Sequence, residues 1–297
     1  MRRRIALLVN PLAGKGRGAA LGAAAAACLR AAGHEVLDVS AGTADAARER
    51  ARAAIERGVD VLAVCGGDGM VHLGAGLCAG TALPLGIIAA GTGNDVATAL
   101  GLPVHDAAAA ASVIAGDHVR SIDAGRSVDA DGVSRWWVGV LGAGFDSRVN
   151  ERANGWAWPR GRLRYTLAVG RELPVFRPVP FVLEVDGRRR EIRAMLVAVG
   201  NGPSYGGGMQ VCPDADPADG LLDVVVVHAL SIPAFLRVFP RVFAGTHVRH
   251  PAVETLRGRR VRLEAPGIVA YADGERVGPL PLDCEVVPGA LRVLTTP

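Results

Sequence analysis

The 297-residue sequence is poor in the residues that define several protein classes. Its five cysteines include no C-x-x-C pair and stand apart from any histidine cluster, which argues against a disulfide framework and structural zinc. No apolar run approaches the roughly 18–20 residues that a membrane-spanning helix needs. The first apolar run ends at Asn10–Pro11, too short for an export signal and typical of a β-strand. We therefore expect a globular, cytoplasmic protein.

Lysine is nearly absent, because Lys15 is the only one, and the net charge of +4 comes from arginine. Arginine and alanine replace other residues throughout the chain, so the basic balance is weak support for binding nucleic acid, and we expect no such partner. Local charge is more informative, since residues 152–193 hold ten arginines and four acidic residues. This stretch either faces an anionic surface or forms an ordinary solvated face.

The first part of the chain, from Arg4 to about Asp123, alternates short apolar runs with longer amphipathic ones. Strands are expected at Ile5–Val9 and Glu35–Val39, in the run that ends at Cys65, and at Pro84–Ile88, with helices between them. Strands that are apolar on both faces indicate a parallel sheet covered by helices. The sequence therefore predicts an α/β domain.

Beyond Ile122 the pattern changes to hairpins. The turn signals Asp129–Gly132 and Asp186–Arg189 each lie between alternating apolar runs, which predicts an antiparallel sheet. Helices are expected only at Leu163–Glu172 and Pro233–Phe243. We set the domain limits at 1–125 for the α/β domain, joined by about 287–297, and at 126–286 for the β-rich domain.

Three glycine-rich loops follow predicted strands of the first domain. They are Asn10–Gly18, Gly66–Met70 and Ala89–Asp95, and ligands of parallel sheets bind at such loops. Adjacent glycines let a phosphate approach backbone amides, whereas Asp68 would repel that phosphate unless a cation lies between them. A nucleotide with Mg²⁺ explains both features.

Two acidic turns in the second domain are candidates for chemistry. Four aspartates between Asp214 and Asp223 suit a hard cation with oxygen ligands, or an Asx-type turn without metal. Asp273 and Glu275 flank Gly274, where a carboxylate could accept the proton of a substrate hydroxyl. An ordinary hairpin turn is the alternative for that segment.

Together these segments resemble the diacylglycerol kinase catalytic-domain family, which includes bacterial lipid kinases and sphingosine kinases. The resembling pieces are NPLAGKG, GGDGM, PLGIIAAGTGND, GAGFD at Gly142–Asp146, NGPSYGGGMQVCPDADPADGLLD at Asn201–Asp223, and ADGE at Ala272–Glu275. The resemblance implies an N-terminal α/β domain of phosphofructokinase-like topology, mostly parallel, and a C-terminal, mainly antiparallel β-sandwich domain. It also implies an active site between the two domains.

The resemblance further implies an ATP- and Mg²⁺-dependent kinase that phosphorylates a lipid hydroxyl at the membrane surface, converting diacylglycerol to phosphatidic acid. Glu275 is implied as the general base, with Asp273 and Asp68 supporting catalysis. Magnesium, and no other metal, is implied at the Asp219 side chain and the carbonyls of Asp216 and Leu221. ATP contacts are implied at Asn10, Pro11, Leu12, Ala13, Gly14, Thr43, Gly66, Gly67, Asp68, Gly69, Met70, Val71, His72 and Thr92. For Thr43 the sequence itself predicts only a helix N-cap.

Three positions depart from the family pattern, and there are two alternative functions. Met70, Leu73 and Ala89 stand where the family usually has Thr, Glu and Pro. These changes keep a catalytically impaired nucleotide- or lipid-binding regulator as an alternative. A NAD kinase shares the GGDG loop but pairs it with an N-E-x-x-D segment, which this sequence lacks.

Two aromatic segments are candidates for contact with a bilayer, at the inner face of the membrane. The first comprises Trp156, Trp158 and Tyr165 with Arg160, Arg162 and Arg164. The second comprises Phe235, Leu236, Phe239, Val242 and Phe243 with Arg237 and Arg241. For the second set we favour core packing, because Phe and Val at helical spacing usually face inward. The oligomeric state stays open, a homodimer included.

Overall fold

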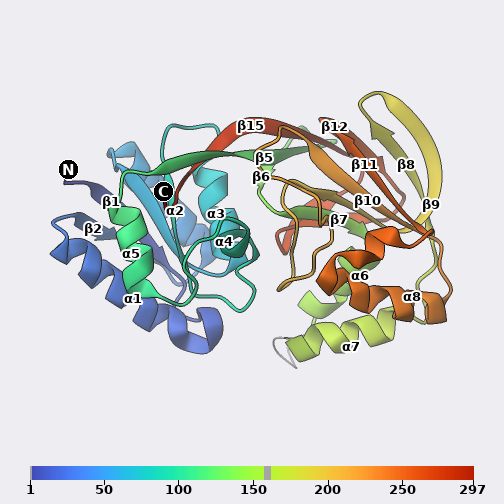
Figure 1. Ribbon diagram of the computed structural model, residues 1–297, viewed down its shortest axis with the longest axis horizontal. Helices are drawn as coiled ribbons and strands as arrows, with labels where there is room; N and C mark the ends of the chain where they lie inside the picture. Colours follow the sequence, from blue (N-terminus) through green and yellow to red (C-terminus); the bar gives the residue numbers. More distant parts are fainter. Residues whose placement is uncertain (1, 157–161) are drawn as a thin grey trace. The chain divides into compact units, whose positions relative to one another are not determined.

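A computed structural model describes the backbone of residues 2–156 and 162–297 and divides the chain into two compact units (Figure 1). The first unit consists of Met1–Ala124 and Pro288–Pro297, and the second of Gly125–Val287. The chain passes between the units within two strands, β5 and β15, whose bounds are Val119–Asp129 and Leu282–Leu294. Each unit has its own apolar core.

The first unit is a parallel sheet in the order β2-β1-β3-β4, with the end of β15 beside β4. Every residue of β3 and β4 is buried, which confirms the prediction from their continuous apolar runs. The elements of this unit are β1 (Arg4–Val9), α1 (Ala13–Ala31), β2 (Glu35–Asp38), α2 (Ala44–Glu56), β3 (Val61–Gly66), α3 (Asp68–Cys78), β4 (Leu85–Ala89), α4 (Asp95–Ala99) and α5 (Ala107–Ala115).

The second unit is built from antiparallel strands with helices against one face. Strand β10 (Leu222–His228) has a continuous run of apolar residues because both of its faces are covered. Val224 and Val226 enter a core shared with other strands, whereas Val225 and Val227 pack with α6 (Phe145–Asn154) and α8 (Ile232–Val238). The other elements are β6 (Ser134–Trp137), β7 (Val140–Gly144), α7 (Arg162–Glu172), β8 (Val179–Val185), β9 (Arg188–Gly200), the 3₁₀ helices η1 (Phe239–Ala244) and η2 (Thr246–Arg249), β11 (Val253–Gly258), β12 (Arg260–Glu264), β13 (Val269–Ala272) and β14 (Glu275–Pro279).

Two predicted helices differ in their limits. Helix α3 begins at Asp68, where the sequence predicts a loop, because Gly67 takes the extended N-cap conformation. The helix expected over Pro233–Phe243 is divided into α8 and η1, since Pro240 lacks the N–H that the α-helical ladder needs. Both differences arise at residues that begin or interrupt a helix.

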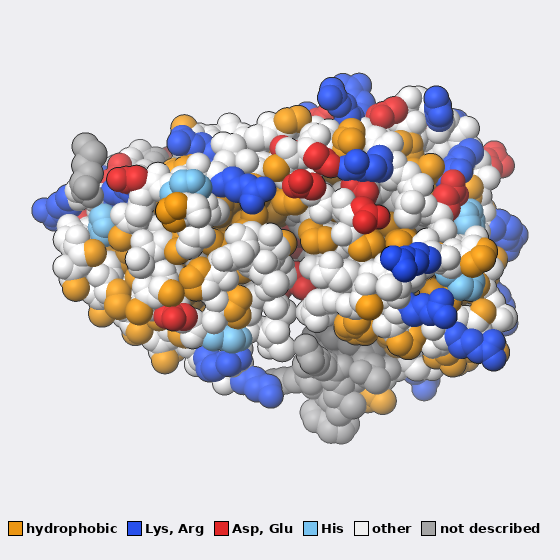
Figure 2. Space-filling view, in the orientation of Figure 1, with side chains coloured by type: hydrophobic (Ala, Val, Ile, Leu, Met, Phe, Trp, Pro, Cys, Tyr) orange, Lys and Arg blue, Asp and Glu red, His pale blue; other side chains and the backbone are white. Residues whose placement is uncertain are grey.

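The arginine-rich stretch 152–193 is partly neutralised by acidic partners. Arg189 pairs with Glu264 at 3.3 Å and Arg190 with Glu254 at 2.7 Å, and both glutamates lie outside the stretch. Figure 2 shows blue and red side chains interspersed over the strands β8 to β12. The charge excess of the sequence therefore does not form a uniformly basic face on these strands.

All five cysteines are free thiols. In the described part of the chain, no helix is long and apolar enough to cross a membrane.

Candidate functional site

The three glycine-rich loops follow β1, β3 and β4, which are neighbours in the parallel sheet. Because parallel neighbours end at the same edge, the loops gather there, as predicted. Loops two and three touch through their main chains, since a Cβ atom added at Gly91 would lie 2.4 Å from the Gly67 Cα atom. Loop one contacts loop three in the same way, with a Cβ atom at Gly14 falling 2.1 Å from the Ala90 oxygen. A side chain at either glycine would force the loops apart.

Loop one contains a left-handed turn just inside α1. Gly14, Lys15 and Gly16 have φ values of 56°, 63° and 92°. Lys15 is exposed, and a left-handed conformation is uncommon for a residue with a side chain. Turns of successive left-handed residues turn their amides toward one concavity, which suits an anion. Asn10 shapes the entrance, because its side-chain oxygen accepts the Leu12 N–H at 3.0 Å.

Asp68 holds loop three in place. Its carboxylate accepts the backbone N–H of Asn94 at 2.9 Å and that of Val96 at 3.3 Å. The sequence predicts that Asp68 meets a phosphate-bound cation, so these bonds add a positioning role. Carboxylate oxygens are also the ligands that a hard cation prefers.

Loop three is also closed on itself. The Asn94 side chain accepts the Gly91 N–H at 2.8 Å and donates to the Gly91 oxygen at 3.1 Å. Asn94 is also the N-cap residue of α4, but its side chain closes the loop and makes no cap hydrogen bond. Thr92, at the tip of the same loop, is exposed.

The other residues implied to contact ATP differ in what they offer. Pro11, Leu12 and Thr92 are exposed, but Val71 is buried in the core and presents only its backbone. Met70 packs over Gly66, since a Cβ atom there would fall 2.3 Å from the Met70 Cγ atom. Thr43 is the N-cap of α2, as predicted, and its hydroxyl accepts the Ala46 N–H at 3.3 Å.

In the second unit, Asp273 and Gly274 form the turn between β13 and β14. Their φ values of 53° and 86° match the positive values that an Asp-Gly hairpin turn adopts. The two oxygens of Asp273 accept the N–H groups of Gly139 at 2.8 Å and Val138 at 3.0 Å. Glu275, two residues later, is exposed. Asp273 thus fixes the turn, and Glu275 carries the accessible carboxylate.

The acidic turn around Asp219, where the resemblance implies magnesium, is held by hydrogen bonds and by an arginine. One Asp219 oxygen accepts the Leu221 N–H at 3.0 Å, and the other forms an ion pair with Arg257. Arg257 also pairs with Asp223 at 3.3 Å, and the Asp216 carbonyl accepts the Asp219 N–H at 3.4 Å. A guanidinium therefore stands where the cation was expected. In the described residues no group of three or more acidic, histidine or cysteine side chains could hold a metal ion.

The sequence assigns no role to a pair that the structure brings together, Asp146 and Tyr205. The Tyr205 hydroxyl donates to Asp146 Oδ2 at 3.0 Å, and within the described structure Oδ1 is buried without a partner. Burial raises the pKa of Asp146 to about 6, although the Tyr205 hydrogen bond opposes the shift. Both residues lie in segments that carry the family resemblance, and their contact spans 59 positions of the chain.

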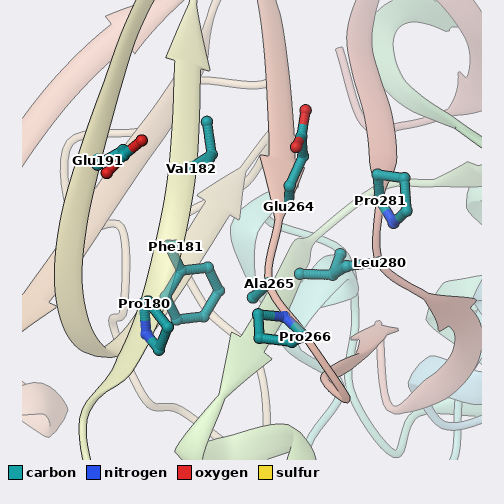
Figure 3. A pocket seen from close by; sticks show the side chains of 9 residues that line it. All are labelled: Pro180, Phe181, Val182, Glu191, Glu264, Ala265, Pro266, Leu280 and Pro281. Atoms are coloured by element: carbon teal, nitrogen blue, oxygen red, sulfur yellow. The ribbon is translucent and has the colours of Figure 1, made fainter.

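A separate hollow of about 420 Å³ lies in the second unit (Figure 3). Apolar side chains form most of its wall, including Phe181, Leu280 and Pro281, with Glu191 and Glu264 at one end. It contains none of the predicted site residues. The first bilayer candidate lies partly outside the described residues, namely Trp158 and Arg160 and the side chains of Arg162, Arg164 and Tyr165.

Comparison with known proteins gives matches along both halves of the chain. Residues 4–127 match the diacylglycerol kinase catalytic domain, and residues 139–295 match the YegS C-terminal NAD kinase beta sandwich-like domain. A diacylglycerol kinase of Mycobacterium tuberculosis is 43% identical over 98% of this chain and 94% of that protein. A probable lipid kinase YegS-like protein of Stenotrophomonas maltophilia is 34% identical over 81% of this chain and 80% of that protein.

Solved structures share the fold of the whole chain. A Bacillus anthracis structure with 26% sequence identity has a TM-score of 0.79 and is matched over 99% of this chain and 96% of its own. An NAD kinase from Archaeoglobus fulgidus in complex with ATP, 12% identical, has a TM-score of 0.55 over 98% of this chain and 93% of its own. The second likeness concerns the fold alone. Together they confirm the predicted α/β domain and C-terminal β-sandwich domain.

Proposed function

Because this chain belongs to the diacylglycerol kinase family and is a lipid kinase, we propose that it transfers the γ-phosphate of ATP, with Mg²⁺, to diacylglycerol. The product would be phosphatidic acid. The observation that carries the proposal is the meeting of three loops at one sheet edge, with main-chain contact between Gly67 and Gly91. Glycine at these contact points lets a phosphate approach the backbone of the loops closely.

The nucleotide would be held mainly by backbone. Gly67 caps α3 without a side-chain acceptor, so amides of the first turn can donate to phosphate oxygens. In the left-handed turn at Gly14–Gly16 the Gly16 N–H already donates to the Leu12 oxygen at 3.3 Å, and the exposed ammonium of Lys15 would add a positive charge for the phosphates. Leu12, which is 81% exposed, lies beside this turn and is available for an apolar contact with the adenine ring of ATP.

Magnesium would be held by Asp68 together with the phosphates. The fit rests on the oxygen chemistry of the Asp68 carboxylate and on its place at the first turn of α3, where the phosphate-binding amides lie. When bound, Mg²⁺ neutralises charge that develops on the transferring phosphoryl group. The bonds from Asp68 to Asn94 and Val96 would keep the carboxylate and loop three in a fixed relation during the reaction.

Glu275 is the proposed general base. It would take the proton of the acceptor hydroxyl as the hydroxyl oxygen attacks the γ-phosphate. The assignment is supported by the contrast with Asp273, whose two oxygens already accept backbone N–H groups. Asp273 would act as a positioning residue that fixes the hairpin from which Glu275 projects.

The test is to incubate pure protein with γ-labelled ATP, Mg²⁺ and a panel of diacylglycerol, ceramide, sphingosine and NAD in detergent micelles. We expect labelled phosphatidic acid, and no label in a reaction with EDTA. Label in ceramide or sphingosine alone would identify that lipid, and not diacylglycerol, as the acceptor. Label in NAD alone would establish a NAD kinase, and ATP binding without turnover would identify a regulator.

A further inference from the structure

The helical segment formed by α8 and η1 in the second unit exposes large apolar side chains. Ile232, Leu236 and Phe243 are 39%, 55% and 56% exposed. The chain stays helical from one element into the next, since Val238 and Phe239 both have right-handed helical angles. At 3.6 residues per turn, Leu236 lies on the same side of α8 as Ile232, four residues earlier. Phe243, in the 3₁₀ helix η1, adds a further exposed apolar side chain beyond the end of α8.

The opposite side of this segment is anchored in the core. Phe235, Val238 and Val242 are buried, and the Phe235 ring lies 5.1 Å from that of Phe145 in the second unit's core. The rings continue outward, with Phe235 stacked on Phe239 at 5.6 Å and Phe239 edge-to-face with Phe243 at 6.5 Å. The exposed Phe243 is therefore the outer end of a continuous aromatic contact. Its exposure is fixed by the fold.

The Asp, Glu, Lys and Arg side chains within residues 224–253 all have one sign. Between Asp223 and Glu254 the sequence contains no acidic residue, and it contains three arginines. All three, Arg237, Arg241 and Arg249, are exposed. Figure 2 shows blue and orange side chains together in the region where Figure 1 places α8, without red among them. Arg237 follows the exposed Leu236 directly, and Pro233 and Pro240 of the same segment are also exposed.

We propose that the outward face of α8 and η1 docks on the surface of an anionic lipid bilayer. The inference rests on the proposed function, because a kinase of a membrane lipid must reach its acceptor there. Leu236, Phe243 and Ile232 would enter the boundary between headgroups and acyl chains, while Arg237 and Arg241 reach lipid phosphates. Exposed apolar side chains accompanied by arginines match an anionic interface in both polarity and charge. The core packing favoured from the sequence holds for Phe235 and Val242, and is wrong for Leu236 and Phe243.

The experiment measures sedimentation of the full chain with vesicles of phosphatidylglycerol and phosphatidylcholine, without ATP. We expect Leu236→Ser with Phe243→Ser to weaken vesicle binding roughly tenfold or more, because two large apolar groups no longer leave water. Arg237→Gln with Arg241→Gln should cause a comparable loss at low salt, which shrinks as salt rises. The matched control is Val133→Ser, at a residue that is 46% exposed in the turn between β5 and β6.

A second measurement separates this proposal from the proposed function. On a water-soluble, short-chain diacylglycerol, all these variants should keep the wild-type kcat. A wild type that binds vesicles through these residues but does not phosphorylate diacylglycerol would overturn the function and leave the docking face. Vesicle binding unchanged in both double variants, with unchanged melting temperatures, would overturn the docking face. The docking face is also overturned if light scattering shows a wild-type dimer that the apolar variant makes monomeric while vesicle binding persists.

Discussion

The first unit joins its candidate loops through main-chain contacts, whereas the second unit uses carboxylates to hold its turns. Gly67 and Gly91 meet with no side chain between them, and Gly14 meets Ala90 in the same way. In the second unit, Asp273 binds two backbone amides and Asp219 pairs with Arg257. In the first unit, adding a side chain at a glycine should therefore disturb the loops most. In the second unit, removing a carboxylate oxygen that accepts a hydrogen bond should disturb the turns most. An acidic residue in a family segment can therefore have a structural role only.

The largest effect is expected from Gly91→Ala. The added methyl group would press on the Gly67 backbone, which cannot rotate away as a side chain could. Displacing phosphate-binding amides by about 1 Å should lower kcat/KM about 100-fold or more. The control is Gly76→Ala in α3, where an added Cβ atom meets nothing within 4 Å. Equal activity of the two variants would show that the loop contact is unimportant for turnover.

A slightly smaller effect on kcat is expected from Glu275→Gln, and it separates catalysis from positioning. The amide keeps the shape but removes the basic oxygen, so kcat should fall about 100-fold while the ATP dissociation constant and melting temperature stay unchanged. Asp273→Asn should behave differently. Its side-chain NH₂ would face a backbone N–H that the carboxylate oxygen now accepts, so the free energy of unfolding should fall by about 1–3 kcal/mol. Full activity in Glu275→Gln would move the base elsewhere.

A third effect concerns Asp146 and pH. Its folded pKa of about 6 lies above the ordinary aspartate value of 3.8, so the folded state binds the proton more tightly than the unfolded state. The stabilising contribution of the protonated carboxyl is complete below pH 4 and is lost as pH rises through 6, by up to about 3 kcal/mol. Asp146→Asn should reduce the loss of stability between pH 4 and pH 7, measured by urea unfolding. Parallel pH profiles for the two proteins would contradict the assigned burial.

The smallest effect is expected at Arg257. Without nucleotide, Mg²⁺ should raise the melting temperature of the wild type little, because Arg257 already balances Asp219 and Asp223. Arg257→Gln should cost about 1 kcal/mol, as expected for a partly exposed ion pair, and Mg²⁺ should restore part of that loss. A large Mg²⁺-dependent shift in the wild type that disappears in Asp219→Ala would instead support the metal site implied by the family.

Local signals in the sequence predicted most of the framework. Alternation of apolar runs indicated the parallel strands of the first unit, and the turns at Asp129–Gly132, Asp186–Arg189 and Gly274 each join two strands of the second. Each of these signals lies within a few residues of the structure it predicts. Helix limits were less accurate, because Gly67 and Pro240 change the backbone over only one turn.

The contacts at the site that the sequence did not predict join residues far apart in the chain. Arg257 reaches Asp219 across 38 positions, Asp68 reaches Asn94 across 26, and Tyr205 reaches Asp146 across 59. A single sequence carries no pattern that joins such pairs, since periodicity and turn chemistry act over a few residues. Phe235 is buried and its neighbour Leu236 is exposed. This difference likewise depends on a distant partner, because the Phe235 ring packs against Phe145 in the core.

The left-handed turn of loop one has a practical consequence for chemical labelling. Its Lys15 carries the only ε-amino group of the chain, and this group is exposed. An amine-reactive reagent can therefore modify the loop selectively, competing only with a free N-terminal amine. A single fluorophore or crosslinker attached there would report directly on occupancy of the loop, without any engineered cysteine.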